Sequence, residues 1–294
     1  MPEIKRVGVL GAGLMGHGVA QVAAQAGYDV VLREVDADRL ATGVGRIEKH
    51  LSRAVEKGRM EQADADAVKA RIQGTTDYAD LADCDLVLEA IPEDLPAKLA
   101  MWAELDGIVK ADALFATNTS SLPVINQAAS TSRPDRFLGL HFFNPVQVMK
   151  LLEVIRCVTT SDESYRAGLE FGEKLGKLPV KARDSAGFIV NRLLVPYMVD
   201  AIRAYEEGVG TIEEIDAAMK AGAGHPMGPL TLLDFVGLDT TGAICETLFD
   251  EFRERRFAQP PLLRKMLAAG WYGQKSGMGF YDYSGDKPVP NPGI

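Results

Sequence analysis

Apolar residues in the first half of the chain occur as short runs, separated by longer stretches in which they recur every three or four residues. Short apolar runs are typical of buried strands, and the longer periodic stretches are typical of amphipathic helices. Strand-type runs occupy residues 6–10, 28–34, 85–91, 113–118 and 137–143, and helical stretches occupy 36–58 and 95–109. Because the two kinds of segment alternate, the pattern predicts an α/β fold with a parallel, doubly wound sheet, whose ligands lie at the carboxyl ends of the strands.

The pattern changes near residue 184. Before this point, strand-type runs at 149–156 and 179–183 flank a helical stretch at 161–175. Beyond it the periodicity is helical, and a glycine-rich tail at 273–281 is expected to form an ordered loop. The helical stretches there are 188–207, 211–220, 229–255 and 261–269. We therefore predict a doubly wound domain over residues 1–184 and a smaller all-α domain over residues 185–294.

Composition narrows the class of protein. A chain of 294 residues that is 47% hydrophobic and 25% charged is long enough for two globular domains. No apolar run approaches membrane-span length and no signal-peptide core is visible, so we expect a cytoplasmic protein without membrane contact. The three cysteines are too few and too scattered for a disulfide framework or a zinc site, and no metal is expected. A formal net charge of −9 argues against nucleic-acid binding.

A glycine-rich turn follows the first strand-type run and opens an alanine-rich helix. It reads GxGxxG, and its candidate cofactor contacts are Gly11, Gly13, Leu14, Met15 and Gly16. The first glycine permits the tight turn, the second admits a pyrophosphate, and the third lets the helix pack on the strand. Glu34 ends the next strand, eighteen residues after Gly16, where a ribose 2′-hydroxyl would be met. This Rossmann-type fingerprint predicts NAD rather than NADP, although Arg33 leaves that preference open.

A histidine and an acid bracket the segment after the fifth strand-type run. His141 precedes Phe-Phe-Asn-Pro, and Glu153 lies twelve residues downstream. A histidine beside a carboxylate can take or return a proton near neutral pH, which makes the pair a candidate general acid and base. Alone, the two residues would also fit a buried core histidine and an ordinary surface acid. Further polar residues follow predicted strand ends, namely Glu93, Asn118, Thr119 and Ser120.

Basic residues recur on one face of the helix predicted at 36–58. They are Arg46, Lys49, Arg53 and Lys57, at spacings of three, four and four. In an acidic chain, an anionic ligand needs such a local patch of cations. Charge runs on helices are usually only solvated faces, so this basic stripe alone leaves both interpretations open.

Together these motifs resemble the 3-hydroxyacyl-CoA dehydrogenase family over nearly the whole chain, and the length is similar to its bacterial 3-hydroxybutyryl-CoA dehydrogenase branch. The blocks concerned are the GxGxxG turn, 118–122, 141–153, 187–192, 226–229 and 275–277. The resemblance implies that His141 and Glu153 are catalytic and that Ser120 and Asn191 hold the substrate hydroxyl. It also implies a CoA contact at Lys57, to which the helical spacing adds Arg53. The cofactor contacts that it implies are Glu34, Glu93, Lys98, Asn118, Ser120 and Lys275.

The same resemblance implies an activity. It is the NAD-dependent interconversion of a short-chain (S)-3-hydroxyacyl-CoA and its 3-oxoacyl-CoA, as in fatty acid β-oxidation. The resemblance also implies a homodimer built on the C-terminal domain. Two alternatives stay open. One is a related dehydrogenase of a sugar acid such as gulonate, against which the basic stripe argues. The other is a non-catalytic NAD-binding protein, against which the intact His141 and Glu153 argue.

Overall fold

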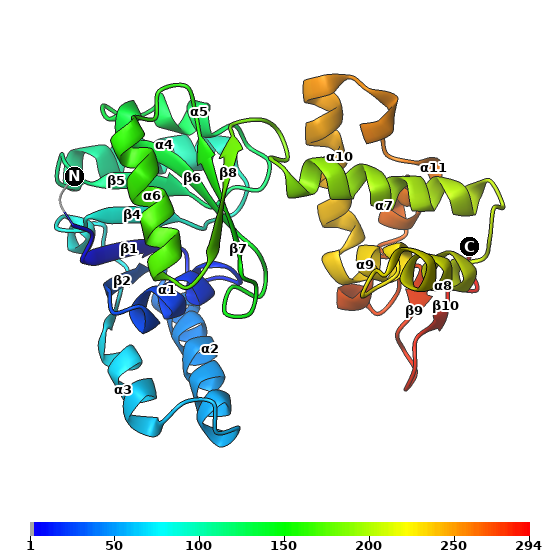
Figure 1. Cartoon of the computed structure of the whole chain (residues 1–294), viewed down its shortest axis with the longest axis horizontal. Coiled ribbons are helices and arrows are strands. Elements are labelled where there is room, and N and C mark those ends of the chain that lie inside the picture. Colours follow the sequence, from blue (N-terminus) through cyan, green and yellow to red (C-terminus); the bar gives the residue numbers. More distant parts are fainter. Residues whose placement is uncertain (1–2) are drawn as a thin grey trace. The chain divides into compact units, whose positions relative to one another are not determined.

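The chain divides into two compact units, Met1–Ser185 and Ala186–Ile294, and the computed structural model describes residues 3–294 (Figure 1). Each unit has its own hydrophobic core. The first is an eight-stranded sheet flanked by helices, and the second is mainly helical. The expected α/β class with a helical C-terminal part is confirmed.

The sheet of the first unit has the strand order β3-β2-β1-β4-β5-β6-β7-β8. Its strands are β1 (Arg6–Leu10), β2 (Asp29–Arg33), β3 (Ile72–Thr75), β4 (Leu86–Glu89), β5 (Leu114–Thr117), β6 (Phe137–Phe142), β7 (Leu151–Arg156) and β8 (Leu178–Arg183). Its helices are α1 (Gly16–Gln25), α2 (Ala37–Glu56), α3 (Gln62–Ala70), α4 (Leu95–Ile108), α5 (Val124–Ala128) and α6 (Asp162–Lys174). The strand order reverses direction between β1 and β4, which is where a doubly wound sheet opens a ligand crevice.

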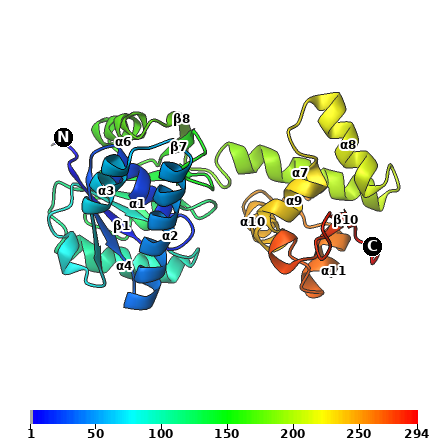
Figure 2. The same ribbon diagram turned by 90° about the horizontal axis from the view of Figure 1, so that it is seen from below.

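Side chains alternate between the two faces of each strand, and this alternation explains why the central strands are apolar throughout. Leu114 and Ala116 of β5 join the core cluster formed with α1 and α6. Phe115, between them, packs on Trp102 of α4, with ring centroids 4.9 Å apart. The helices α1 and α6 thus cover one face and α4 the other (Figure 2). Both faces of the sheet are therefore covered by packed side chains, which hold the strand ends in place.

The edges of the sheet differ from the expected all-parallel arrangement. β7 runs antiparallel to β6, and β8 is parallel to β7. Only residues 143–150 connect β6 to β7, which is too short for the crossover that a parallel pair requires. At the other edge, α3 and β3 were not predicted, because β3 is a short strand with no buried residue.

The second unit is built from five α-helices: α7 (Val190–Glu206), α8 (Ile212–Ala223), α9 (Pro229–Val236), α10 (Leu238–Phe252) and α11 (Pro261–Ala268). The prediction of one helix over 229–255 was wrong. The chain breaks at Gly237, whose φ of 100° lies outside the helical region and is accessible mainly to glycine. Among residues 3–294, no helix is both long and apolar enough to cross a membrane.

The C-terminal tail is tied to the helices by two buried aspartates. Asp216 accepts hydrogen bonds from the backbone of Leu230 at 2.8 Å and from the Tyr281 hydroxyl at 2.9 Å. Asp234 accepts from the backbone N–H groups of Phe280 and Tyr281 at 2.9 and 2.8 Å. Burial is the main cause that raises the pKa of Asp234 to about 6, although these hydrogen bonds oppose it. The tail is therefore an ordered part of the unit, in which β9 (Tyr281–Asp282) pairs with β10 (Val289–Pro290).

The raised pKa of Asp234 predicts a definite pH dependence of stability. Its ordinary value is 3.8 and its folded value is about 6, so between these pH values the folded protein holds a proton that the unfolded chain has lost. This contribution is complete below pH 4 and is lost as the pH rises through 6, amounting to up to about 3 kcal/mol. We expect Asp234→Asn to remove this dependence. Thermal denaturation of the unmodified protein and of Asp234→Asn from pH 4 to 7 measures the pH dependence of stability. If the two proteins showed the same change of stability with pH, Asp234 would not be its source.

Candidate active site

The glycine-rich turn joins β1 to α1 at the carboxyl edge of the sheet. Gly11 has a φ of 91° and its N–H donates to the Arg33 carbonyl at 2.8 Å, which ties the turn to β2. A Cβ on Gly16 would overlap the Gly11 carbonyl oxygen, whereas a Cβ on Gly13 would meet no atom within 4 Å. The first and third glycines are therefore required by the fold itself. The second keeps a space open above the turn, as a pyrophosphate requires.

A pocket of about 500 Å³ extends from this turn along the end of β2. Its floor carries the Glu34 carboxylate, which accepts from the N–H groups of Ala12 at 2.9 Å and Val35 at 2.7 Å. These bonds fix the acid in the pocket as a hydrogen-bond acceptor, which suits a ribose diol. The Arg33 guanidinium stacks 3.8 Å above the Tyr78 ring on the same pocket wall. The Arg33 guanidinium and the Glu34 carboxylate thus line the same pocket, where NADP would carry a 2′-phosphate and NAD a hydroxyl.

We expect this arrangement to favour NAD(H) over NADP(H), because the fixed Glu34 carboxylate repels a 2′-phosphate. Glu34→Ser should narrow the preference by removing that repulsion while Arg33 remains to attract the phosphate. Arg33→Gln is the matched control, since it should widen the preference. Steady-state kinetics with both cofactors measure the ratio. Equal use of NADH and NADPH by the unmodified protein would overturn the role given to Glu34.

His141 and Glu153 meet across the antiparallel pair β6 and β7, where the two residues are direct partners in the ladder. His141 Nδ1 lies 2.7 Å from Glu153 Oε2, and both side chains are at most 5% exposed. An ionised carboxylate can only accept, so Nδ1 carries the proton and Nε2 presents its lone pair. The Ser120 hydroxyl lies 3.2 Å from that Nε2. The three side chains form a chain from a buried acid to a hydroxyl, the arrangement of a general base with its orienting partner.

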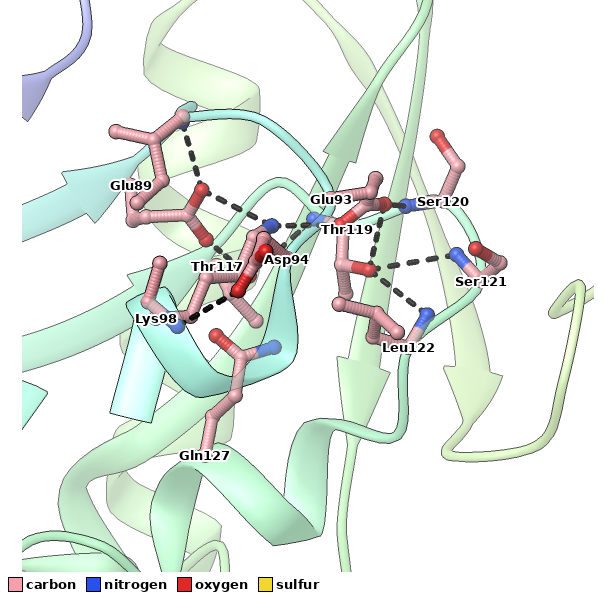
Figure 3. Close-up of polar contacts among 12 residues, drawn as sticks. Glu89, Glu93, Asp94, Lys98, Thr117, Thr119, Ser120, Ser121, Leu122 and Gln127 are labelled. Carbon is pink, nitrogen blue, oxygen red and sulfur yellow. Dashed lines mark hydrogen bonds and ion pairs between the residues drawn. The ribbon is translucent and has the colours of Figure 1, made fainter. Parts of the chain in front are cut away.

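The loops after β4 and β5 hold Ser120 in place through hydrogen bonds (Figure 3). Glu93 Oε1 accepts from the Ser120 N–H at 2.6 Å and from the Thr119 hydroxyl at 2.8 Å. Asn118 Oδ1 accepts from the backbone N–H of Phe142, the residue after the histidine, at 2.8 Å. The residues predicted at these strand ends are therefore brought together by hydrogen bonds at one edge of the sheet.

Lys98 lies deeper than the sequence suggested. A lysine near the start of a helix is usually exposed, but this one is buried. The Lys98 side chain is 1% exposed, with its ammonium 2.7 Å from Glu93 and 3.0 Å from Glu89. In this structure its direct contacts are therefore the two acids, and a cofactor contact stays a prediction.

The basic stripe lies on α2, which begins after the N-cap Asp36 and ends at the C-cap Lys57. All four of its members, Arg46, Lys49, Arg53 and Lys57, are exposed. Arg46 lines the pocket described above, and the stripe continues from there for roughly 16 Å along the helix. Among residues 3–294, none of the four forms an ion pair with a carboxylate. Their charges remain available to an external anion.

Two predicted site residues belong to the second unit. Asn191 lies in the first turn of α7, and Lys275 lies in the short 3₁₀ helix Gln274–Ser276 of the tail. The Lys275 ammonium pairs with Asp239 at 2.5 Å. Their roles toward substrate and cofactor stay predictions.

The sequence did not single out several residues that build the site. Glu89 lies inside the apolar run 85–91, and an acid in such a run is a signal because a buried charge requires a partner. Tyr78 and Arg39, which line the cofactor pocket, carried no such signal, because they reach it from loops and helix starts.

The first unit is thus a doubly wound sheet with a dinucleotide turn, a fixed ribose acceptor and a histidine–carboxylate pair, features that define a nicotinamide-dependent dehydrogenase. Residues 6–185 match the family described as "3-hydroxyacyl-CoA dehydrogenase, NAD binding domain", and residues 187–283 match "3-hydroxyacyl-CoA dehydrogenase, C-terminal domain". The chain belongs to the 3-hydroxyacyl-CoA dehydrogenase family, and its cofactor is NAD.

Relatives from bacteria and animals match nearly the whole chain. It is 48% identical to a 3-hydroxybutyryl-CoA dehydrogenase of Bradyrhizobium diazoefficiens, over 98% of each chain. It is 46% identical to the mitochondrial hydroxyacyl-coenzyme A dehydrogenase of Homo sapiens, over 95% of this chain and 91% of the human one. Its structure is similar to that of (S)-3-hydroxybutyryl-CoA dehydrogenase from Ralstonia eutropha, with a TM-score of 0.94 and 43% identity over 96% of this chain and 100% of that one.

Proposed function

We propose that the protein is an NAD-dependent (S)-3-hydroxybutyryl-CoA dehydrogenase. The observation that carries the proposal is the chain Glu153–His141–Ser120, in which a buried carboxylate fixes one tautomer of an imidazole that faces a hydroxyl. Such a base suits a reaction in which a secondary alcohol loses its proton. The relatives named 3-hydroxybutyryl-CoA dehydrogenase support the substrate class.

The side chains of this chain divide the work of proton transfer. In the oxidative direction, His141 Nε2 removes the proton of the substrate hydroxyl. Glu153 keeps the ring oriented and stabilises the imidazolium that forms, because the two charges are close and shielded from water. Ser120 would hold the reacting oxygen by a hydrogen bond. In the reductive direction, His141 returns the proton to the same oxygen.

The residues present fit a dinucleotide. The open space above Gly13 admits the pyrophosphate, and the Glu34 carboxylate is already oriented toward the pocket. Glu93 and Asn118, tied to the loops beside Ser120, would contact the nicotinamide end. NAD, when bound, accepts or supplies the hydride.

The basic stripe would bind the phosphates of CoA, because it supplies exposed cations on a protein with a formal net charge of −9. Lys57→Ala should raise KM for acetoacetyl-CoA by roughly three- to thirtyfold, with a smaller effect at high salt. kcat should change little, because this contact is remote from the reacting carbon and equal in ground and transition states. Steady-state kinetics at two ionic strengths measure both parameters.

Acetoacetyl-pantetheine is the control substrate, since it keeps the thioester and lacks the nucleotide phosphates. Lys57→Ala and Arg53→Ala should leave its KM unchanged. A variant that weakens both substrates equally, or neither, would show that the stripe is only a solvated face.

The activity itself is tested by following NADH oxidation against acetoacetyl-CoA, longer 3-oxoacyl-CoAs and the oxo form of a sugar acid. We expect turnover with the CoA thioesters and the highest kcat/KM with acetoacetyl-CoA. A preference for the sugar acid would support the gulonate-type alternative, and binding of NADH without turnover would support a non-catalytic protein.

We further propose that the protein works in the cytoplasm as a homodimer formed through its helical unit. The three cysteines are free and buried, which suits a reducing compartment. Exposed apolar side chains on the helices, such as Leu193 of α7 and Phe235 of α9, offer surface for a second copy.

A further inference from the structure

Glu89 is a buried acid of the first unit. It ends β4, is fully buried and lies 3.0 Å from the Lys98 ammonium. Its carboxylate also accepts from the Thr117 hydroxyl at 2.6 Å and from the Ile91 N–H at 2.7 Å (Figure 3). Burial raises the pKa of Glu89, while Lys98 is the largest of the opposing influences. A carboxylate kept here is costly unless its partners hold it in a defined geometry.

Lys98 is shared between two acids of unequal burial. Its ammonium lies between Glu89, which is inaccessible, and Glu93, whose side chain is 38% exposed. Packing alone therefore does not fix the Glu93 carboxylate, since a half-exposed acid can change rotamer in water. The buried pair of Glu89 and Lys98 provides the rigid anchor for it.

Two contacts connect the Glu93 carboxylate to the catalytic histidine. Glu93 accepts from the Ser120 N–H at 2.6 Å, and the Ser120 hydroxyl lies 3.2 Å from His141 Nε2. A second route runs from Glu89 through the Thr117 hydroxyl, which accepts from the Thr119 N–H at 3.3 Å. Both routes start at Glu89 and end in the loop that carries Ser120.

We propose that Glu89 is a positioning residue for the dehydrogenase reaction, acting through Lys98 on Glu93 and thereby on Ser120. Glu89 fixes the position of the Lys98 ammonium. The ammonium in turn holds the Glu93 carboxylate against the backbone N–H of Ser120. This inference rests on the proposed function, in which Ser120 and His141 share the substrate oxygen. Positioning of this kind affects the rate because small displacements of a reacting contact are costly.

Glu89→Gln tests the proposal, because it keeps the shape and an acceptor for the Ile91 N–H but loses the charge. We expect kcat to fall roughly ten- to thirtyfold while KM for acetoacetyl-CoA stays within about twofold. The control is Asp106→Asn. Asp106 is a partly buried acid of the same unit that pairs with Arg133 at a distance of 2.8 Å, and this pair is not part of the site. This variant should lose stability and keep its kcat.

A double-mutant cycle separates positioning from a general loss of stability. In a Lys98→Met background, Glu89→Gln should cause a much smaller further loss of kcat, because the main route of its effect passes through the missing ammonium and only the contact with Thr117 remains. Losses that add in full would overturn the proposal. If a single variant fails to fold, the double variant Glu89→Gln/Lys98→Met, which removes both buried charges, is used instead. Its kcat and KM are then compared with those of the unmodified enzyme, and an unchanged kcat would overturn the proposal.

A measurement without substrate or cofactor distinguishes failure of this inference from failure of the proposed function. The chain has four histidines, so the ¹⁵N resonances of His141 can be assigned by comparison with His141→Ala. Glu89→Gln should shift the Nε2 resonance, because the Ser120 contact loosens, and Asp106→Asn should not. An unchanged His141 spectrum in Glu89→Gln would overturn the positioning role, whatever the substrate proves to be.

Discussion

Replacing His141 by alanine is expected to lower kcat with acetoacetyl-CoA by about 10²-fold or more, since a positioned general base contributes 10²- to 10⁴-fold. Glu153→Gln should lower it to a similar degree. The glutamine fills the same space but supplies no charge to stabilise the imidazolium formed at 2.7 Å. Stopped-flow or steady-state NADH oxidation measures the loss.

Fluorescence titration with NADH serves as the control for these variants. Neither side chain belongs to the glycine turn or to the pocket around Glu34, so cofactor affinity should stay nearly intact. Near-normal turnover by His141→Ala would remove this histidine from the mechanism. A loss of NADH binding equal to the loss of turnover would show instead that the substitution had disturbed the cofactor site.

The glycine turn provides the second large effect, in a matched pair of substitutions. Gly16→Ala places a methyl group against the Gly11 carbonyl oxygen, and neither backbone segment can yield without moving β1 or α1. We expect a loss of at least about 3 kcal/mol in the free energy of unfolding, with loss of NADH binding. Gly13→Ala meets no atom within 4 Å and should fold normally. Its methyl group occupies the space of the pyrophosphate, so NADH affinity should fall.

Chemical denaturation and NADH titration of the two variants test this division. The informative result is the contrast: one glycine serves the fold, and the other serves the ligand. Equal losses of stability in both variants would contradict it. So would a Gly13→Ala protein that binds NADH as tightly as the unmodified protein.

The cofactor half of the site was predictable because its signals are local. GxGxxG encodes a backbone path, and Glu34 follows at the distance of one helix and one strand, so the spacing alone places both at one edge of the sheet. The direction of β7 could also have been predicted, since the connection 143–150 is too short for a parallel crossover. Hydrophobic periodicity by itself carries no information on strand direction.

Other features depend on contacts between distant residues, which a single sequence does not encode. The burial of Lys98 depends on two acids from the preceding strand and loop, and nothing in its helical spacing marks it as buried. The break at Gly237 is similar, because leucine-rich periodicity continues on both sides and an isolated glycine is tolerated inside helices. Tertiary contacts decided both outcomes.

The pairing of His141 with Glu153 in the β6–β7 ladder has a consequence for how this enzyme could tolerate insertions and deletions. Because the ladder fixes both backbones, the connecting segment 143–150 could gain or lose residues without separating the two side chains, provided the strands keep their alignment. A slip of one residue in β7 would instead turn Glu153 to the opposite face of the sheet. The enzyme should therefore accept length changes in that loop far more readily than a single-residue deletion within β7.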